Sequence, residues 1–204
     1  SSLVGSEMCI RDRPTRAEVS DVANAIYDRT GCIMLSGETA MGDYPLECVN
    51  TMVKVAKSVE PTINYWKRFT KKDWKIEEAD IESHAAYTTC VTARDIKADA
   101  IIDYTHTGNS ARRLAGYGPA CPIFAITDSE KVYNQLGPIW NVYPVLVKDG
   151  EDIDDTIEKG VEKLLEEGKL EKGDTAVLCG GPQIMSKEKS KYAVNKTVGG
   201  ILKI

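Results

Sequence analysis

The sequence predicts an α/β protein in two parts, the terminal portion of a TIM-type (β/α)8 barrel followed by a doubly wound α/β domain. From residue 76 onward, segments with helical periodicity alternate with short apolar runs, which is typical of a parallel sheet with helices on both faces. Earlier in the chain, the apolar residues 32–35 open into a polar, glycine-bearing loop that ends at Pro45. Barrel strands deliver polar groups to their carboxyl edge in this way.

The composition is that of an ordinary globular protein with one or two cores. The chain has 204 residues, of which 42% are hydrophobic, and a formal net charge of −5. Lysine and arginine are scattered rather than gathered into a stripe, which argues against a nucleic-acid partner. Because no apolar run approaches the ~20 residues that span a bilayer, we expect no membrane partner either.

The first predicted element is a capped helix. Thr15 and Glu18 form a capping box, in which each side chain satisfies a backbone N–H group of the first turn. The helix is expected to run to about Asp28. Its buried stripe would consist of Val19, Val22 and Ile26.

A buried strand and a long helix are predicted next. Residues 32–35 do not alternate between apolar and polar, as expected for a strand that is covered on both faces. Pro45 suits a first helical position, and the helix would run to about Trp66. Its apolar face needs a partner surface, which the rest of a barrel would supply. That face consists of Leu46, Val49, Val53, Ala56, Val59 and Ile63.

A charged segment with poor periodicity, residues 67–75, is predicted to separate the two domains. Trp66, Phe69 and Trp74 are expected to pack at this junction. After it, helices and strands alternate. Helices are expected near 81–96, 110–117, 130–136 and 153–167, strands near 100–104, 122–126, 142–147 and 175–179, and a final edge strand or hairpin within 192–204.

The cysteines are expected to be free. No CxxC pair is present, and only Cys9 lies outside an apolar setting. Buried thiols of a cytoplasmic protein are therefore favoured over disulfides or metal ligands. The six residues are Cys9, Cys32, Cys48, Cys90, Cys121 and Cys179.

The first polar loop, which follows residues 32–35 and ends at Pro45, offers hydroxyl and carboxyl groups at a barrel mouth. Ser36 and Glu38 are its candidate functional residues. An alternative explanation is structural: Gly37 and Gly42 shape a tight loop, while Glu38 pairs with a neighbouring arginine.

The second polar loop, residues 105–110, follows an apolar strand and opens a helix. Backbone N–H groups at a helix N-terminus, surrounded by hydroxyl groups, can cradle a phosphate. A plain N-cap by Asn109 or Ser110 would explain part of the same pattern. His106 can add charge near neutral pH, although an exposed spectator fits equally well. One of Arg112 and Arg113 would face the anion, and the sequence does not decide which.

Residues 35–45 together with residues 14–25 resemble pyruvate kinase at the last two β/α units of its barrel. The resemblance extends from Arg13 to the C-terminus. It implies that residues 13–70 end the barrel domain and residues 76–204 form the C-terminal α/β domain. Residues 1–12 do not match the family and have no signal-peptide pattern, so we expect them to be disordered.

The resemblance implies an enzyme that transfers a phosphoryl group from phosphoenolpyruvate to ADP, with Mg²⁺ and K⁺ as cofactors, in a homotetramer. The catalytic lysine and the acidic metal ligands belong to earlier barrel strands. We therefore expect no metal ligand in this chain and no activity from it alone. Ser36 would lie near the nucleotide, and Glu38 would join a polar network that relays a proton to the enolate of pyruvate.

The resemblance also places the helix with Arg16, Glu18 and Asp21 beside the active site and the subunit interface. A simpler role for its acidic groups is to stabilise the helix N-terminus, worth ~0.3–1 kcal/mol each.

The loop of residues 105–110 matches one that holds a phosphate of a sugar-phosphate activator in pyruvate kinases, often fructose 1,6-bisphosphate. The matching positions are Thr105, Thr107, Gly108, Asn109 and Ser110. Residues 180–184 lack evident aromatic or arginine contacts to a second phosphate. Charge would then come from Lys187, Lys189 and Lys191, unless these belong to a solvated loop. The effector would be a phosphorylated sugar or a nucleotide, or there is none.

The main alternative is a free-standing module that binds a phosphometabolite or mediates dimerisation. The barrel-type loop has no use in such a module. A dinucleotide-binding protein would need a Gly-x-Gly-x-x-Gly turn after a first strand, which the sequence lacks.

Overall fold

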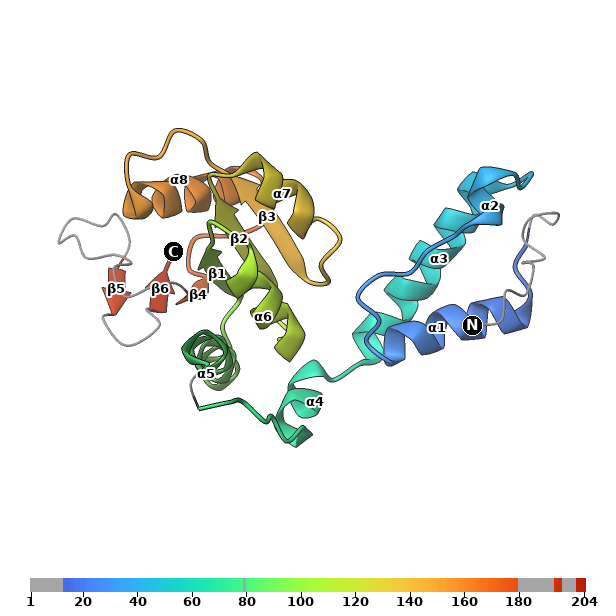
Figure 1. Cartoon of the computed structure of the whole chain (residues 1–204), viewed down its shortest axis with the longest axis horizontal. Helices are drawn as coiled ribbons and strands as arrows, with labels where there is room; N and C mark the ends of the chain where they lie inside the picture. Colours follow the sequence, from blue (N-terminus) through green and yellow to red (C-terminus); the bar gives the residue numbers. More distant parts are fainter. Residues whose placement is uncertain (1–12, 79, 180–192, 196–200) are drawn as a thin grey trace. The chain divides into compact units, whose positions relative to one another are not determined.

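The structure is a computed structural model that describes residues 13–78, 80–179, 193–195 and 201–204. The chain forms two compact units, residues 1–64 and residues 65–204, which Figure 1 colours along the sequence. None of the described helices combines the length and the apolar character needed to cross a bilayer.

The first unit begins with the predicted capped helix. α1 (Arg16–Tyr27) starts after Thr15, whose hydroxyl accepts a hydrogen bond from the Glu18 N–H. The Glu18 carboxylate in turn accepts from the Thr15 N–H at 2.8 Å, so the predicted capping box is confirmed. α1 contacts α3 (Pro45–Val59), and its apolar stripe is half-buried.

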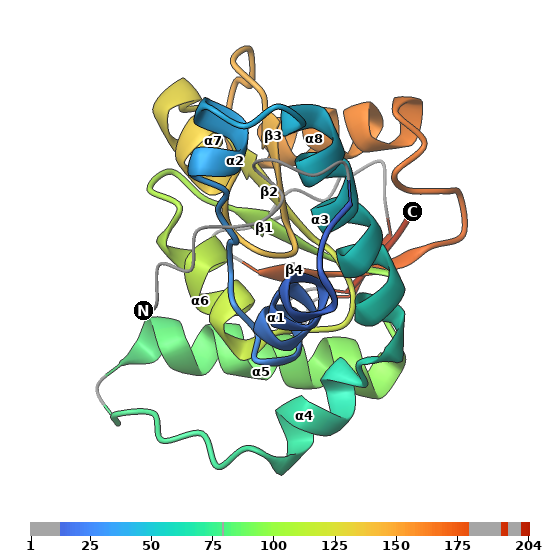
Figure 2. The same cartoon turned by 90° about the vertical axis from the view of Figure 1, so that its right-hand side faces the viewer.

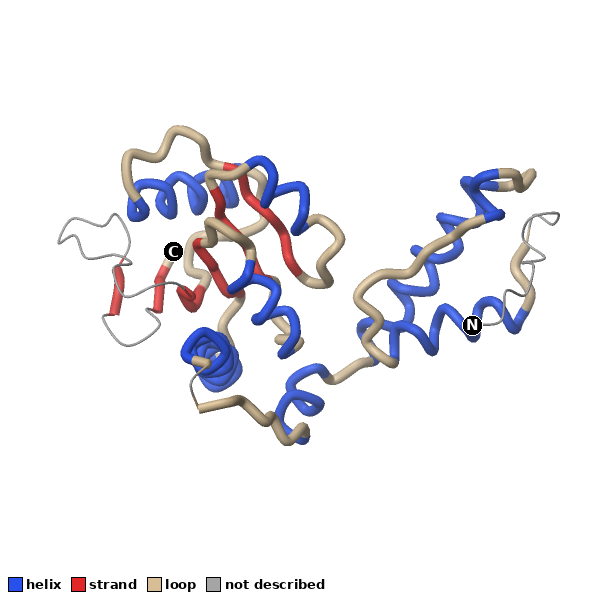
Figure 3. The backbone as a smooth tube through the Cα atoms, viewed as in Figure 1, coloured by secondary structure: helices blue, strands red, loops and turns tan. Residues whose placement is uncertain are grey.

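The predicted strand at residues 32–35 does not form. This segment is an irregular loop, drawn in tan in Figure 3. A strand needs a neighbour that satisfies its N–H and C=O groups, and residues 13–64 contain no second strand. Met34 is 85% exposed, so the expected cover on both faces is also wrong.

The predicted long helix from Pro45 is broken into pieces. α3 ends at Val59, the 3₁₀ turn η2 (Glu60–Thr62) follows, and a separate helix, α4 (Tyr65–Lys71), belongs to the second unit. Pro61 explains the break, because proline lacks the N–H that a helix interior needs. On the apolar face of α3, Leu46 remains 73% exposed. The described residues therefore do not cover this part of the helix.

The second unit is built on a sheet with the strand order β3-β2-β1-β4-β6-β5. The parallel strands are β1 (Ala100–Tyr104), β2 (Ile123–Thr127), β3 (Val142–Leu146) and β4 (Thr175–Cys179). β6 (Ile201–Lys203) runs antiparallel to β4, and β5 (Ala193–Asn195) runs antiparallel to β6. The predicted strands and the final antiparallel pair are confirmed.

Helices cover both faces of this sheet, as Figures 1 and 2 show. Residues of α5 (Ile81–Ile96), α6 (Asn109–Tyr117) and α7 (Glu130–Leu136) share one core with Ile101 of β1. α8 (Ile153–Glu166) packs on the opposite face, against Ile102. The doubly wound α/β architecture is therefore confirmed.

The segment marked as a connector in the sequence packs into the second unit. Phe69 of α4 is 2% exposed and makes ring contacts with Trp66, Trp74, Tyr87 and Tyr117. We call these five residues the aromatic cluster. The predicted packing of the three junction aromatics is confirmed, but residues 65–71 are helical because Phe69 anchors them to this core.

The described cysteines are free thiols. Cys48, Cys90, Cys121 and Cys179 are buried, as predicted. Cys32 is exposed, because the strand that would have buried it does not form.

Candidate functional site

The second polar loop leaves the carboxyl end of β1, in the middle of the parallel part of the sheet. β2 and β4 flank β1 on its two sides, so the order of the strands reverses at this point. Ligands of open α/β sheets bind outside the carboxyl ends of the strands at such a switch point. Thr105, Thr107, Gly108, Asn109 and Ser110 thus lie together where β1 leads into the first turn of α6.

The loop is held in shape by its own side chains. The buried Thr105 hydroxyl accepts a hydrogen bond from the Gly108 N–H at 2.9 Å, and the Thr107 hydroxyl accepts from the Asn109 N–H at 3.4 Å. Gly108 has a φ of 80°, and a Cβ there would lie 2.7 Å from the Arg112 guanidinium. Glycine is therefore required at this turn.

The N-cap residue of α6 supplies no side-chain acceptor, and in the first turn the Asn109 N–H alone is bonded, by the Thr107 hydroxyl, among the contacts described above. This N-cap residue is Gly108, so the alternative in which Asn109 or Ser110 caps the helix is wrong. Uncapped N–H groups of a first turn carry the positive end of the helix dipole. The exposed side chains of Thr107 and Asn109 stand beside them and can reach a ligand.

The two neighbouring arginines have different partners. Arg113 lies 2.8 Å from the Asp80 carboxylate and 3.2 Å from the Glu82 carboxylate, at the start of α5. Arg112 donates a hydrogen bond to the Thr107 carbonyl at 3.2 Å. Arg112 is therefore the arginine beside the loop, which the sequence left open.

The two histidines are both exposed. His106 lies at the rim of the site, and its Nδ1 is 2.9 Å from Oδ1 of Asp128, which follows β2. His84 lies on α5 and makes no contribution to the loop.

A buried acid that the sequence analysis did not single out lies beneath the loop. Asp103 of β1 is fully buried, and its Oδ2 accepts a hydrogen bond from the Ser110 hydroxyl at 2.8 Å. Its Oδ1 has no hydrogen-bond partner of normal geometry among the described residues. Burial raises the pKa of Asp103 to about 7, and hydrogen bonds from Ser110 and the Cys179 thiol offset only part of this effect. The available signal was an acidic residue inside an otherwise apolar strand.

The first polar loop lies in the other unit, around the short helix α2 (Gly37–Ala40). The Glu38 carboxylate accepts a hydrogen bond from the Ser36 N–H at 2.8 Å, and Ser36 itself is exposed. A Cβ on Gly42 would lie 2.5 Å from the Glu38 carbonyl oxygen, which explains the glycine. In this arrangement Glu38 stabilises its own turn.

The predicted residues of α1 lie in the N-terminal part of that helix. Glu18 is engaged in the capping box, while Arg16 and Asp21 are exposed. Among the described residues, no cluster of three or more His, Cys, Asp or Glu side chains is placed to hold a metal ion.

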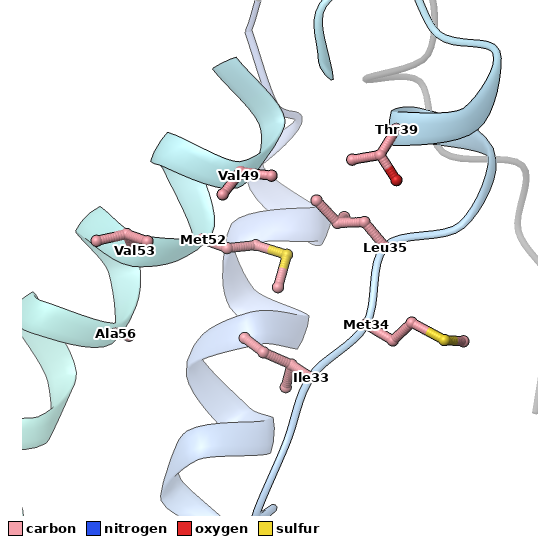
Figure 4. A pocket seen from close by; sticks show the side chains of 8 residues that line it. All are labelled: Ile33, Met34, Leu35, Thr39, Val49, Met52, Val53 and Ala56. Carbon is pink, nitrogen blue, oxygen red and sulfur yellow. The ribbon is translucent and has the colours of Figure 1, made fainter. Parts of the chain in front are cut away.

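A groove of about 540 Å³ runs between the irregular segment of residues 33–35, together with Thr39, and α3 (Figure 4). Its lining is apolar apart from one hydroxyl group, so it offers no charge to a phosphate. The lining residues are Ile33, Met34, Leu35, Thr39, Val49, Met52, Val53 and Ala56.

The fold and the loop define a class of protein: a doubly wound α/β domain with a polar loop at its switch point, preceded by a helical unit. Two family models match the chain, "Pyruvate kinase, alpha/beta domain" over residues 83–192 and "Pyruvate kinase, barrel domain" over residues 3–49. The chain therefore belongs to the pyruvate kinase family, whose members are phosphotransferases.

Individual relatives agree with this assignment. A pyruvate kinase of Clostridium acetobutylicum is 44% identical over 169 residues, which cover 83% of this chain and 36% of the relative. A pyruvate kinase of Sporosarcina psychrophila is 42% identical over 173 residues, which cover 83% of this chain and 29% of the relative. A crystal structure of a Cryptosporidium parvum pyruvate kinase, 32% identical, covers 87% of this chain and 36% of that one with a TM-score of 0.79. The chain thus spans only 29–36% of the length of these relatives.

The resemblance and the fold class predicted from the sequence are confirmed. The barrel match begins at Leu3, inside the segment 1–12 that was set apart from the family. That segment lies outside the described residues, as do residues 180–184 and the lysines at 187, 189 and 191. The domain bounds and the roles of the site residues remain predictions.

Proposed function

We propose that the protein to which this chain belongs transfers a phosphoryl group from phosphoenolpyruvate to ADP, with Mg²⁺ and K⁺ as cofactors. The observation that carries this proposal is the match of both the barrel and the α/β family models to one chain. The whole protein would act in the cytoplasm as a homotetramer, with the helix of Arg16, Glu18 and Asp21 near its active site.

The chain itself would supply only auxiliary groups to this reaction. Ser36 would lie on the nucleotide side, and Glu38 would help to relay the proton that the enolate of pyruvate takes up at carbon. Phosphoryl transfer depends on a positioned metal ion and a cationic group at the moving phosphate. The resemblance implies that the metal ligands and the cationic group come from earlier barrel strands. We therefore expect the chain alone to be inactive.

A coupled assay with lactate dehydrogenase tests this expectation. The purified chain, supplied with phosphoenolpyruvate, ADP, Mg²⁺ and K⁺, should consume no NADH above background. The longer Clostridium acetobutylicum relative serves as the positive control. Turnover by the chain that disappears in a Glu38→Gln variant would contradict the proposed inactivity.

We also propose that the second polar loop binds a phosphate group of a phosphorylated sugar or nucleotide effector. Three features support this: its place at the switch point, the N-terminus of α6 with a glycine as its N-cap residue, and Arg112 alongside. Thr107 and Asn109 would contact the phosphate oxygens, while Thr105 and Gly108 would keep the loop in shape.

Calorimetric titration of the chain with fructose 1,6-bisphosphate, ribose 5-phosphate, glucose 6-phosphate and AMP tests this role. We expect saturable binding of one of these, lost in a Thr107→Ala, Ser110→Ala double variant. Thr88→Ala removes an exposed hydroxyl on α5 and should leave binding unchanged. Binding that survives the double change, or no binding by a folded chain, would argue against the loop.

A further inference from the structure

We propose that Asp103 couples anion binding at the second polar loop to the uptake of one proton, by reversing the hydrogen bond that it shares with Ser110. This inference rests on the proposed phosphate-binding role of the loop. It concerns a residue that contacts the loop from below and would not touch the ligand.

The surroundings of Asp103 contain no charge that compensates an ionised carboxylate. Asp103 is fully buried, and Ser110 of α6 is its hydrogen-bond donor, while Oδ1 has no partner of normal geometry among the described residues. The two nearby arginines are engaged with Thr107 and with the acidic residues at the start of α5. A carboxylate in this position is costly, because burial disfavours its charged form.

The other groups near Asp103 stay neutral around neutral pH. On β2 it pairs with Ala125, and on β4 it pairs with Cys179, whose thiol pKa burial raises to about 12. Cys179 in turn faces two residues of α5: Cys90, whose thiol pKa is raised by burial, and Thr89, which carries only a hydroxyl. Asp103 is therefore the titratable group beneath the loop, whereas His106 and Asp128 face each other at its exposed rim and are unchanged in an Asp103 variant.

The protonation state of Asp103 decides what Ser110 can offer to a ligand. An ionised carboxylate only accepts hydrogen bonds, so the Ser110 hydroxyl must donate its proton to Oδ2. Ser110 then presents only lone pairs toward an anion. A protonated Asp103 donates its own O–H to the Ser110 oxygen, which leaves the Ser110 proton free for a phosphate oxygen.

Charge acts in the same direction as this reversal. An anion at the loop is repelled by an ionised Asp103 and is not repelled by the protonated form. Binding should therefore take one proton from solvent and become tighter as the pH falls. If only the protonated form is competent, the apparent affinity follows its population and weakens about tenfold between pH 6 and pH 8.

Sulfate is the probe for the test, because it keeps its charge over this range, whereas phosphate groups titrate near pH 6. The full chain is titrated with sulfate while the backbone amides of Gly108 and Ser110 are followed by NMR. We expect dissociation constants about tenfold weaker at pH 8 than at pH 6. Asp103→Asn, which is uncharged and can donate to Ser110, should bind equally at both pH values. Asp99→Asn is the matched control, since Asp99 precedes β1 at its other end, where it accepts from the Thr175 N–H at 2.8 Å; it should keep the tenfold change.

Each other outcome overturns the coupling in an identifiable way. Equal affinity of the wild-type chain at both pH values, with shifts at the loop amides, would leave an anion site without proton uptake. A tenfold change that persists in Asp103→Asn would assign the proton to another group. An absence of shifts at pH 6 would remove the anion site itself. If Asp103→Asn does not fold, the carboxyl ¹³C resonance of Asp103 decides: sulfate should raise its titration midpoint, and an unchanged midpoint would refute the coupling.

Discussion

A single carboxyl group inside β1 makes the stability of the second unit depend on pH. Burial raises the pKa of Asp103 to about 7, from an ordinary value of 3.8. The folded chain therefore holds this proton more tightly than the unfolded chain. Its contribution to stability is fully present below about pH 4 and is lost as the pH rises to about 7.

This shift predicts a difference between Asp103→Asn and the wild-type chain. From pH 5 to pH 8 the wild-type chain should lose about 2–3 kcal/mol of unfolding free energy through Asp103, since each pKa unit is worth ~1.4 kcal/mol. Asparagine does not titrate, so the variant should lose that much less. Urea denaturation followed by far-UV circular dichroism at both pH values measures the difference. Parallel losses in the two proteins would show that Asp103 is not the responsible group.

At the scale of residues, the sequence predicted those contacts that join residues close together in the chain. The capping box joins positions three apart, and the members of the second polar loop are contiguous. The assignment of Arg113 to Asp80 joins residues 33 positions apart and could not be predicted from spacing. Asp103 was missed because the strand was interpreted by its apolar character. A single acidic residue in an apolar strand is nevertheless a signal, because a buried carboxyl group needs a hydrogen-bond partner.

At the scale of elements, the alternation of the second unit was predictable because the strands are mostly apolar runs and α5, α7 and α8 each begin after a residue whose side chain caps the helix. The fate of residues 32–35 could not be predicted in the same way, because a strand forms only where a neighbouring strand satisfies its N–H and C=O groups. The break after Val59 was visible in principle, since Pro61 within a helical pattern ends the helix.

α4 offers a test of how far the second unit extends. Phe69→Ala should lower the unfolding free energy of the second unit by about 3–5 kcal/mol. The ring is buried in the aromatic cluster, and its loss leaves a cavity. Phe69→Leu retains most of the volume and should cost less than about 1.5 kcal/mol. Urea midpoints of the two variants provide the comparison. A negligible effect of Phe69→Ala would mean that residues 65–75 are only a connector.

At the scale of the whole molecule, the two units differ in how much apolar surface they bury. Within the described part of residues 1–64, the buried hydrophobic residues are Cys48 and Ile63, whereas both cores of the second unit are extensive. Met34, Met41 and Leu46 are more than 70% exposed. The first unit should therefore be sticky and marginally stable, and the second well folded.

Hydrogen exchange can measure this contrast directly. Amides of α1 and α3 should exchange much faster than those of β1, β2 and β4, because local stability follows buried apolar contacts. α8 provides an internal control for a helix with a buried face. Uniform protection across both units would contradict the expectation.

The aromatic cluster has a practical consequence for spectroscopy. The three tryptophans of the chain, Trp66, Trp74 and Trp140, all lie in the second unit. Tryptophan emission therefore reports on that unit alone, and a melting curve recorded at those wavelengths would look like a single clean transition even after residues 1–64 had lost their structure. A fluorophore attached to the exposed Cys32 thiol would report on the unfolding of residues 1–64.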